Sequence, residues 1–99
     1  MIYEIAELTI KPGTHAAFEA AVAEAVPLFK RAKACLSMRL EHCTEQSERY
    51  HLVVGWETLD DHMVHFRNSA DFQEWRSLVG DYFVAAPKVV HMTTVVSGF

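Results

Sequence analysis

Residues 35–57, CLSMRLEHCTEQSERYHLVVGWE, hold two segments in which polar and apolar residues alternate, separated by a polar turn. An alternation with a period of two predicts β-strands that bury one face. The apolar residues of that face are Leu36, Met38, Leu40, Leu52, Val54 and Trp56. Because the polar residues 45–48 favour a turn, we expect an antiparallel hairpin made of strands 35–44 and 50–57.

The chain before the hairpin contains a third strand and a helix. Residues 2–11 alternate as a strand, and Pro12 and Gly13 end it. Thr14 is expected to cap the helix that follows. Pro27 is expected to kink this helix or to end its first part, because proline removes one hydrogen bond and crowds the preceding turn. The apolar stripe of the helix consists of Phe18, Val22, Val26 and Phe29.

The chain after the hairpin predicts a second helical segment in two pieces, followed by a last strand. Asp60 or Asp61 is expected to cap a short helix, and Ser69 to cap a longer one. Pro87 precedes the last strand, which we expect over residues 88–97. The apolar stripe of the longer helix consists of Phe72, Trp75, Val79 and Phe83.

The resulting order, βαββαβ, predicts one α+β domain over residues 1–99, a ferredoxin-like four-stranded antiparallel sheet with its helices on one face. We expect Arg39 to form an ion pair with Glu7 or Glu41 on the other face. That face is expected to be too apolar to stay bare and too charged for a dry core, so a second copy should cover it in a homodimer. Its residues are Tyr3, Ile5, Glu7, Arg39, Glu41, His51, Val53, Val89, His91 and Val95.

Composition excludes several classes of partner. The net charge of -4 argues against nucleic acid, whose phosphates demand a basic face. No apolar run approaches the roughly 20 residues that cross a bilayer, and residues 1–11 lack the basic start of a signal peptide. Cys35 and Cys43 lie too far apart on one expected strand to form a disulfide, and free thiols suit a reducing compartment. We therefore expect a soluble, cytoplasmic protein without membrane or nucleic-acid partners.

The chain resembles the antibiotic biosynthesis monooxygenase family over nearly its whole length. The resemblance rests on Lys11-Pro12-Gly13 after the opening strand, ACLSMRL at 34–40, VVGWET at 53–58 and HFRNSADFQEW at 65–75. It implies a dimeric α+β barrel in which two sheets pack face to face and each subunit keeps a pocket between sheet and helices. The family includes oxygenases that act on quinols or polyketide aromatics without metal or flavin, haem-degrading enzymes, and members with no known reaction.

Departures from the family narrow these options. The haem-degrading branch uses an asparagine, a tryptophan and a haem-ligating histidine, and the corresponding places here hold Ala6, Phe66 and Arg76. Haem degradation is therefore not expected. Many relatives also carry a histidine directly before an R-x-S motif, where this chain has Phe66. A catalytic histidine can be carried over only if His62 or His65 replaces it from a neighbouring turn.

His62 and His65 are the candidate catalytic residues, because a histidine can act as a base or hydrogen-bond partner near neutral pH. Both also suit a helix surface or a helix end. As a metal pair they lack a third ligand, so no metal site is expected. Arg67 and Arg76 are expected to face solvent. The candidate substrate-binding residues, which suit a plain core equally, are Trp56, Phe66, Phe72 and Trp75.

The leading hypothesis is a cofactor-independent monooxygenase that oxidises a small aromatic quinol or polyketide-like phenol with molecular oxygen. Such chemistry needs a phenol or enol that becomes an anion, a water-poor pocket, a group that takes the proton, and donors for the oxyanion. Two alternatives stay open. One is a non-catalytic dimer that sequesters a small apolar molecule, and the other is an isomerase or cyclase that uses the same pocket without oxygen.

Overall fold

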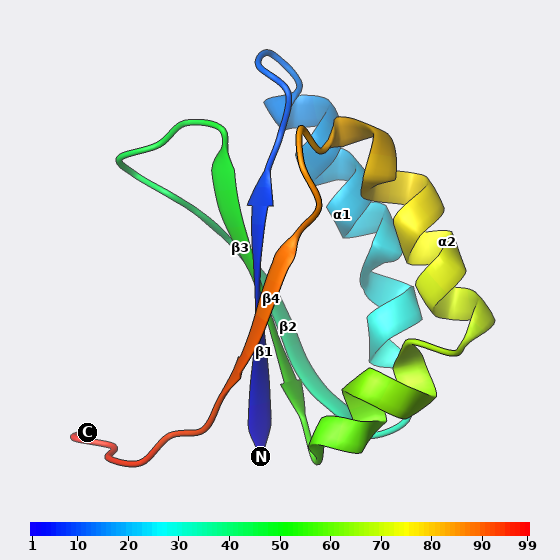
Figure 1. The fold of residues 1–99 in the computed structure, drawn as a ribbon, viewed down its shortest axis with the longest axis vertical. Helices are drawn as coiled ribbons and strands as arrows, with labels where there is room; N and C mark the ends of the chain where they lie inside the picture. The colour runs from blue at the N-terminus through cyan, green and yellow to red at the C-terminus, as the bar shows by residue number, and fades with distance from the viewer.

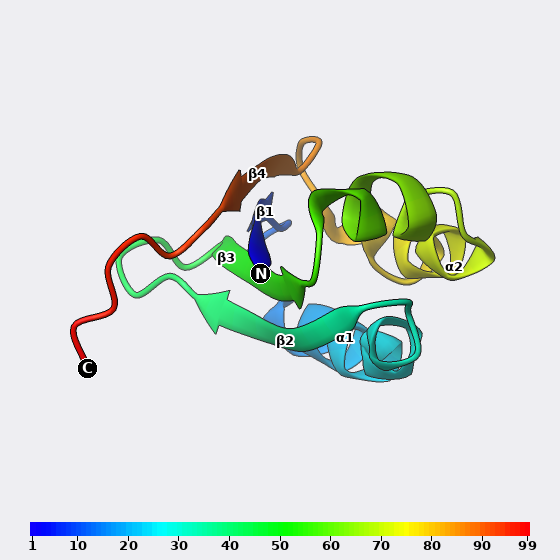
Figure 2. The same cartoon turned by 90° about the horizontal axis from the view of Figure 1, so that it is seen from below.

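The computed structural model describes residues 1–99 and has two layers, an antiparallel sheet and a layer of helices that covers one of its faces (Figures 1 and 2). The strand order across the sheet, β2-β3-β1-β4, is that of a ferredoxin-like fold and confirms the predicted fold class. The elements are β1 (Ile2–Thr9), α1 (His15–Lys30), β2 (Cys35–His42), β3 (Arg49–Trp56), the π-helix η1 (Asp61–Phe66), α2 (Ala70–Val79), the 3-10 helix η2 (Gly80–Tyr82) and β4 (Lys88–Met92).

The core lies between the two layers. β1 and β3 are the central strands, and they pair along their full length from Ile2 opposite Trp56 to Thr9 opposite Arg49. Their inward-facing residues meet the apolar faces of α1 and α2, and each large side chain buried there contributes about 1.5–3 kcal/mol. The most deeply buried large side chains are Leu8, Ile10, Phe18, Phe29, Tyr50, Leu52, Val54, Trp56 and Val79. None of the helices combines the length and the apolar character that crossing a bilayer requires.

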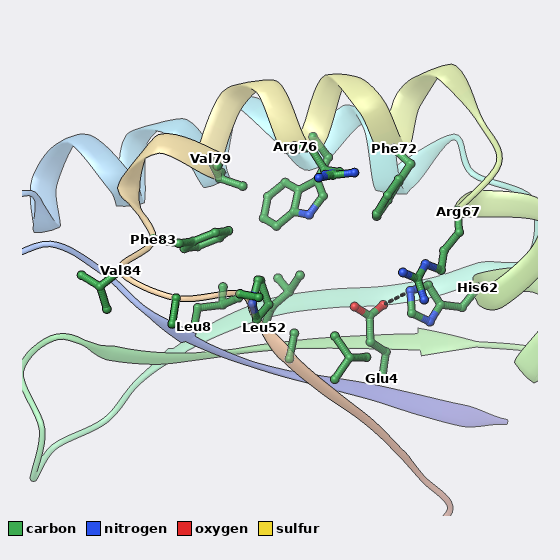
Figure 3. A pocket seen from close by; sticks show the side chains of 17 residues that line it. Glu4, Leu8, Leu52, His62, Arg67, Phe72, Arg76, Val79, Phe83 and Val84 are labelled. Atoms are coloured by element: carbon green, nitrogen blue, oxygen red, sulfur yellow. Dashed lines mark ion pairs between the residues drawn. The ribbon is translucent and has the colours of Figure 1, made fainter.

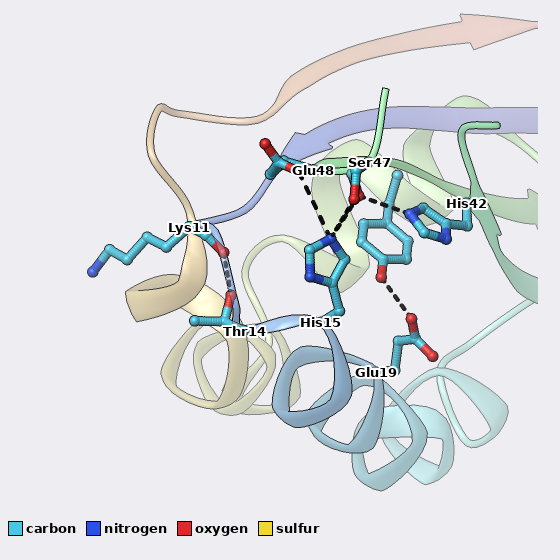
Figure 4. Close-up of polar contacts among 8 residues, drawn as sticks. Lys11, Thr14, His15, Glu19, His42, Ser47 and Glu48 are labelled. Atoms are coloured by element: carbon cyan, nitrogen blue, oxygen red, sulfur yellow. Dashed lines mark hydrogen bonds and ion pairs between the residues drawn. The ribbon is translucent and has the colours of Figure 1, made fainter. Parts of the chain in front are cut away.

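Helix α1 differs from its prediction in its buried face and its cap. Val26 is exposed, because the face turned toward the core runs through Ala25 and Leu28 instead. Pro27 lies inside the helix, which continues to Lys30. Thr14 occupies the N-cap position, but its hydroxyl does not cap the helix; it donates to the Lys11 carbonyl at 2.6 Å (Figure 4).

Both edge strands are shorter than predicted. β2 has a register irregularity between Cys35 and Ser37, which turns Leu36 out to solvent while Met38 stays partly buried against the core. β4 ends at Met92, which pairs with Tyr3 near the start of β1. Because β1 offers almost no further partner, residues 93–99 leave the sheet (Figure 1).

The register of β4 corrects the predicted composition of the outer sheet face. His91 pairs with Glu4 and Val89 pairs with Ala6, and directly opposed residues point to the same face. His91 and Val89 therefore face the helices, and the prediction that they lie on the outer face was wrong. The outer face holds Val90 instead, and Arg39 pairs there with Glu41 at 3.0 Å, one of its two predicted partners.

Two sets of side-chain hydrogen bonds stabilise the starts of η1 and α2. Thr58 and Asp61 form a reciprocal pair before η1: the Asp61 carboxylate accepts from the Thr58 N–H and hydroxyl, and the Thr58 hydroxyl accepts from the Asp61 N–H. Neither Asp60 nor Asp61 caps the helix with its own carboxylate, so that prediction was wrong; the Thr58 hydroxyl binds the first helical N–H instead. The Ser69 hydroxyl accepts from the Phe72 N–H at 3.1 Å, which confirms the predicted cap of α2.

A polar cluster ties α1 to the turn between β2 and β3 (Figure 4). The Nε2 atoms of His15 and His42 each lie 2.7 Å from the Ser47 carbonyl oxygen, so both rings donate to it from Nε2. The Tyr50 hydroxyl donates to Glu19 Oε2 at 2.6 Å, and burial raises the pKa of Tyr50 to about 12. The cluster fixes the turn at the edge of the core.

Candidate functional site

A cavity of about 540 Å³ lies between the inner face of the sheet and α2 (Figure 3). One end is apolar, walled by the last turn of α2 and the segment that leads to β4. The other end is polar, with Glu4, His62 and Arg67 around it. The apolar side chains that line the cavity include Leu8, Leu52, Val79, Phe83 and Val84. A largely apolar hollow with a few convergent polar groups is the usual form of a small-molecule site.

Three ionisable side chains, the Glu4–His62–His91 cluster, lie in contact in a row at the polar end. Glu4 Oε1 lies 3.3 Å from His62 Nε2, and His62 Nδ1 lies 2.8 Å from His91 Nε2. The Trp56 indole N–H donates to the same Glu4 oxygen at 3.1 Å. Glu4 and His62 are buried, whereas His91 is partly exposed. The Glu4–His62–His91 cluster thus extends from the cavity wall toward solvent.

Each member of this cluster is positioned by a local feature of the sequence. Glu4 lies on the inward face of β1, two residues before buried Ala6. His62 follows the Thr58–Asp61 pair and stacks on Trp56, with ring centroids 5.4 Å apart and planes 16° from parallel. His91 comes to the same place because β4 pairs it with Glu4.

Burial governs the charges at the polar end. It raises the pKa of Glu4 from 4.5 to about 7, although the Trp56 hydrogen bond and the Arg67 charge both act to lower it. Burial likewise lowers the pKa of His62 from 6.5 to about 4, and the nearby His91 and Arg67 add to that effect. The pKa of His91 is also lowered, by burial and then by Arg67.

Near neutral pH both histidines are therefore uncharged, and Glu4 exchanges its proton readily. Glu4 Oε1 lies 3.3 Å from His62 Nε2, and either His62 Nδ1 or His91 Nε2 carries the hydrogen of the bond between the two imidazoles. The Glu4 carboxyl can therefore take up and return a proton beside a bound molecule, with two neutral imidazoles next to it.

The structure brings together some of the predicted site residues and separates others. His62, Phe72 and Trp75 line the cavity. His65 is exposed and does not line it, since it lies on a different side of η1 from buried His62. Trp56 is wholly buried behind His62, where it holds the imidazole and Glu4.

The aromatic core continues behind the cavity. Phe66 is buried against Trp56 and Phe29, with ring centroids 5.3 and 4.9 Å apart, and it does not line the cavity. Arg67 and Arg76 are exposed, as predicted, and both also line the cavity. No group of three or more histidine, cysteine, aspartate or glutamate side chains is placed to hold a metal ion.

Sequence reasoning missed two members of the Glu4–His62–His91 cluster, Glu4 and His91. Glu4 follows the same alternation as Ala6 and Leu8, so a carboxylate on a core-facing position of β1 was a visible signal. His91 was assigned to the opposite face because the alternation of a short edge strand does not define its register.

Comparison with known proteins agrees with this architecture. The antibiotic biosynthesis monooxygenase model matches residues 1–78. The uncharacterized protein YczJ of Bacillus subtilis (strain 168) is 38% identical over 95 residues, covering 96% of this chain and 100% of YczJ. A crystal structure of a proposed antibiotic biosynthesis monooxygenase from Bordetella bronchiseptica is 54% identical, with a TM-score of 0.94 and coverage of 96% of this chain and 97% of that one.

A more distant structure has the same fold. SnoaB, a cofactor-independent oxygenase from Streptomyces nogalater, superimposes with a TM-score of 0.83 at 14% identity, covering 98% of this chain and 95% of SnoaB. At that identity the likeness concerns the fold alone. The family model and the close relatives lead to one conclusion: the chain belongs to the antibiotic biosynthesis monooxygenase family.

Proposed function

We propose that this protein is a cofactor-independent monooxygenase that oxidises a small aromatic quinol or polyketide-like phenol with molecular oxygen. One observation carries the proposal: a buried carboxyl, 3.3 Å from a neutral imidazole, borders a largely apolar cavity. A phenol in the cavity meets a proton acceptor beside apolar walls. Family membership and the cofactor-independent oxygenase SnoaB, which shares the fold, support the same reaction class.

The reaction begins with a proton transfer to Glu4. Its Oε1 is occupied by Trp56 and His62, whereas Oε2 makes no hydrogen bond within the chain and is free to accept the substrate proton. The resulting phenolate or enolate passes an electron to oxygen, and the two radicals combine at a ring carbon. Loss of water then leaves a carbonyl: one oxygen atom enters the product, and the other leaves with two substrate hydrogens.

His62 acts in this scheme on Glu4 more than on the substrate. Its Nε2 lies 3.3 Å from the carboxyl and restricts the carboxyl's position, and its hydrogen bond with His91 links the pair to the partly exposed edge of the sheet. We therefore assign the base to Glu4 and the orienting role to His62. His65 has no part in the scheme, while Phe72 and Trp75 form aromatic walls for the substrate.

Oxygen uptake tests this function directly. The metal-stripped protein is assayed against a panel of hydroquinones and anthrones, with their autoxidation subtracted. We expect saturable uptake that falls about 10²–10⁴-fold in Glu4→Gln, the range typical of general-base catalysis. His65→Asn, on the same short helix, serves as the matched control and should keep wild-type turnover. Full activity in Glu4→Gln, or no saturable uptake on any substrate, contradicts the proposal.

The second candidate function is an isomerase that moves a proton within an enolisable substrate. It is favoured by the pKa of Glu4, about 7, because such a carboxyl can both accept and return a proton near neutral pH. The two functions differ in their need for oxygen. Turnover under strict anaerobic conditions supports the isomerase, whereas a purely sequestering protein shows binding without turnover in either atmosphere.

We also propose that two copies pair through the outer sheet face in a homodimer. Val90 and Met92 are 49% and 57% exposed on that face, beside half-buried Tyr3 and Ile5. Helices cover only the opposite side of the sheet (Figure 2). An apolar sheet face of this kind is stabilised when a second sheet removes it from water.

A further inference from the structure

Two of the five arginines differ from the others in lacking an acidic partner. Arg31 pairs with Asp71 at 2.7 Å, Arg39 with Glu41 at 3.0 Å and Arg49 with Glu7 at 3.5 Å. No carboxylate lies within ion-pair distance of Arg67 or Arg76. These are also the two arginines that line the cavity.

A single aromatic ring holds both guanidinium groups at the same wall. The guanidinium carbons of Arg67 and Arg76 lie 5.8 and 5.9 Å from the centroid of Phe72. Figure 3 shows Phe72 between them, with Arg67 directed toward Glu4 and His62. Cation–π contact of this kind favours a position over the ring. Apart from a weak contact of Arg67 Nη1 with Met63 Sδ at 3.8 Å, the N–H groups can donate to a ligand.

The charges around the polar end do not balance. Arg67 brings a permanent positive charge to one carboxyl that burial keeps partly protonated near neutral pH, Arg76 adds a second positive charge to the same cavity wall, and the two neighbouring histidines are neutral there. Guanidinium groups donate in a planar fork that fits carboxylates and phosphates. A bound oxyanion would supply the charge that the protein itself does not.

We propose that the substrate carries an anionic group, a carboxylate or a phosphate, which Arg67 and Arg76 bind beside the hydroxyl that faces Glu4. The inference rests on the proposed function and adds the substrate class: an aromatic acid or aryl phosphate with an ionisable hydroxyl. Its apolar body extends toward Val79 and Phe83, at the other end of the cavity.

Equilibrium binding tests the inference without turnover. Isothermal titration under nitrogen compares 1-hydroxy-2-naphthoate and 1-hydroxy-2-naphthyl phosphate, which both keep a free hydroxyl, with 1-naphthol, which has the same ring system but no anionic group. We expect at least one anionic probe to bind about tenfold or more tightly than 1-naphthol. The Arg67→Gln/Arg76→Gln double variant should lose this preference and keep its affinity for 1-naphthol. Comparison of the two anionic probes separates the carboxylate from the phosphate.

Lys33→Gln is the charge-matched control, because Lys33 is exposed in the loop after α1 and does not line the cavity. It should retain the preference for the anionic probe. Equal binding of charged and uncharged probes overturns the inference, as does equal loss of preference in Lys33→Gln or no binding of either anionic probe. The binding assay consumes no oxygen, so its result is independent of the oxygen-uptake assay. A preference for the anionic probe without oxygen uptake would refute only the proposed oxygenase function. Oxygen uptake without that preference would refute only this inference.

Discussion

Burial shifts the pKa of Glu4 upward and that of His62 downward, which gives them opposite effects on stability. The pKa of Glu4 is raised from 4.5 to about 7, so the protonated carboxyl stabilises the fold fully below pH 4.5. This contribution is lost as the pH rises through 7. For His62, whose pKa is lowered from 6.5 to about 4, the stabilising contribution is complete above pH 6.5 and is lost as the pH falls through 4. Between pH 4.5 and 6.5 the two effects offset each other.

Glu4→Gln should abolish the loss of stability that ionisation of Glu4 causes as the pH rises through 7. Relative to wild type, the free energy of unfolding of this variant should rise by roughly 3 kcal/mol between pH 4.5 and pH 8, because a pKa difference of one unit corresponds to about 1.4 kcal/mol. Urea unfolding at both pH values measures the change. Glu24→Gln, at an exposed position of α1, is the control. A pH-independent difference between Glu4→Gln and wild type would refute the assigned shift.

His91→Leu should leave His62 Nδ1 without its hydrogen-bond partner at 2.8 Å. We expect a loss of about 1–3 kcal/mol in the free energy of unfolding, the cost of an unsatisfied buried polar group. Denaturant unfolding at pH 7.5 measures it, and His65→Leu at an exposed position is the comparison. A change no larger than that of His65→Leu would show that water satisfies His62.

At the level of single residues, the sequence predicted part of the site. His62 was one of two candidate histidines, and the family resemblance favoured its place in a pocket. Glu4 was missed because β1 was judged by its apolar members alone, and His91 because its face depends on pairing with a distant strand. Arg67 and Arg76 are exposed, as expected, but their second role as cavity-lining residues depends on the position of Phe72, which the sequence does not give.

The short helix η1 depends on its polar start. Asp61→Ala removes the acceptor for both the Thr58 N–H and the Thr58 hydroxyl, so we expect a loss of about 1–2 kcal/mol in stability. Because His62 follows directly, ligand binding should weaken as well. Asp60→Ala is the control, since that side chain makes no cap bond. Thermal unfolding and titration calorimetry measure both effects, and equal behaviour of the two variants would contradict the role of Asp61.

At the level of elements, the sequence predicted the four strands, the first helix and the two-part second helical segment. It predicted neither the 3-10 helix η2, which the apolar stripe to Phe83 had included in the longer helix, nor where the edge strands end. Alternation and helical spacing reflect which residues are buried, and these signals are strong in the central strands. The ends of β2 and β4 depend instead on an irregular register and on the length of the neighbouring strand. Neither is encoded in the local pattern, so residues 93–97 were wrongly placed in the sheet.

Val90→Asp should disrupt the proposed dimer, because it places a charge on the exposed outer face of β4. Light scattering coupled to size exclusion should give twice the chain mass of 11.2 kDa for wild type and a single chain mass for the variant. Val64→Asp, at a comparably exposed valine of η1, should remain dimeric. A monomeric wild type, or a dimeric Val90→Asp, would contradict the proposed interface.

For the whole molecule, the order of elements was sufficient to predict the fold, since few topologies join six such elements with short connections. The cavity could not be predicted in the same way, because its shape depends on how far α2 lies from the sheet.

The Glu4–His62–His91 cluster combines one residue each from the first strand, the middle of the sequence and the last strand. It is therefore complete only after β4 has paired with β1, a contact between opposite ends of the polypeptide that closes a large loop. During synthesis, the C-terminal segment must leave the ribosome before this pairing can form. A nascent chain can therefore bury much of its central core before the Glu4–His62–His91 cluster has assembled, so the proposed chemistry has to wait until the fold is finished.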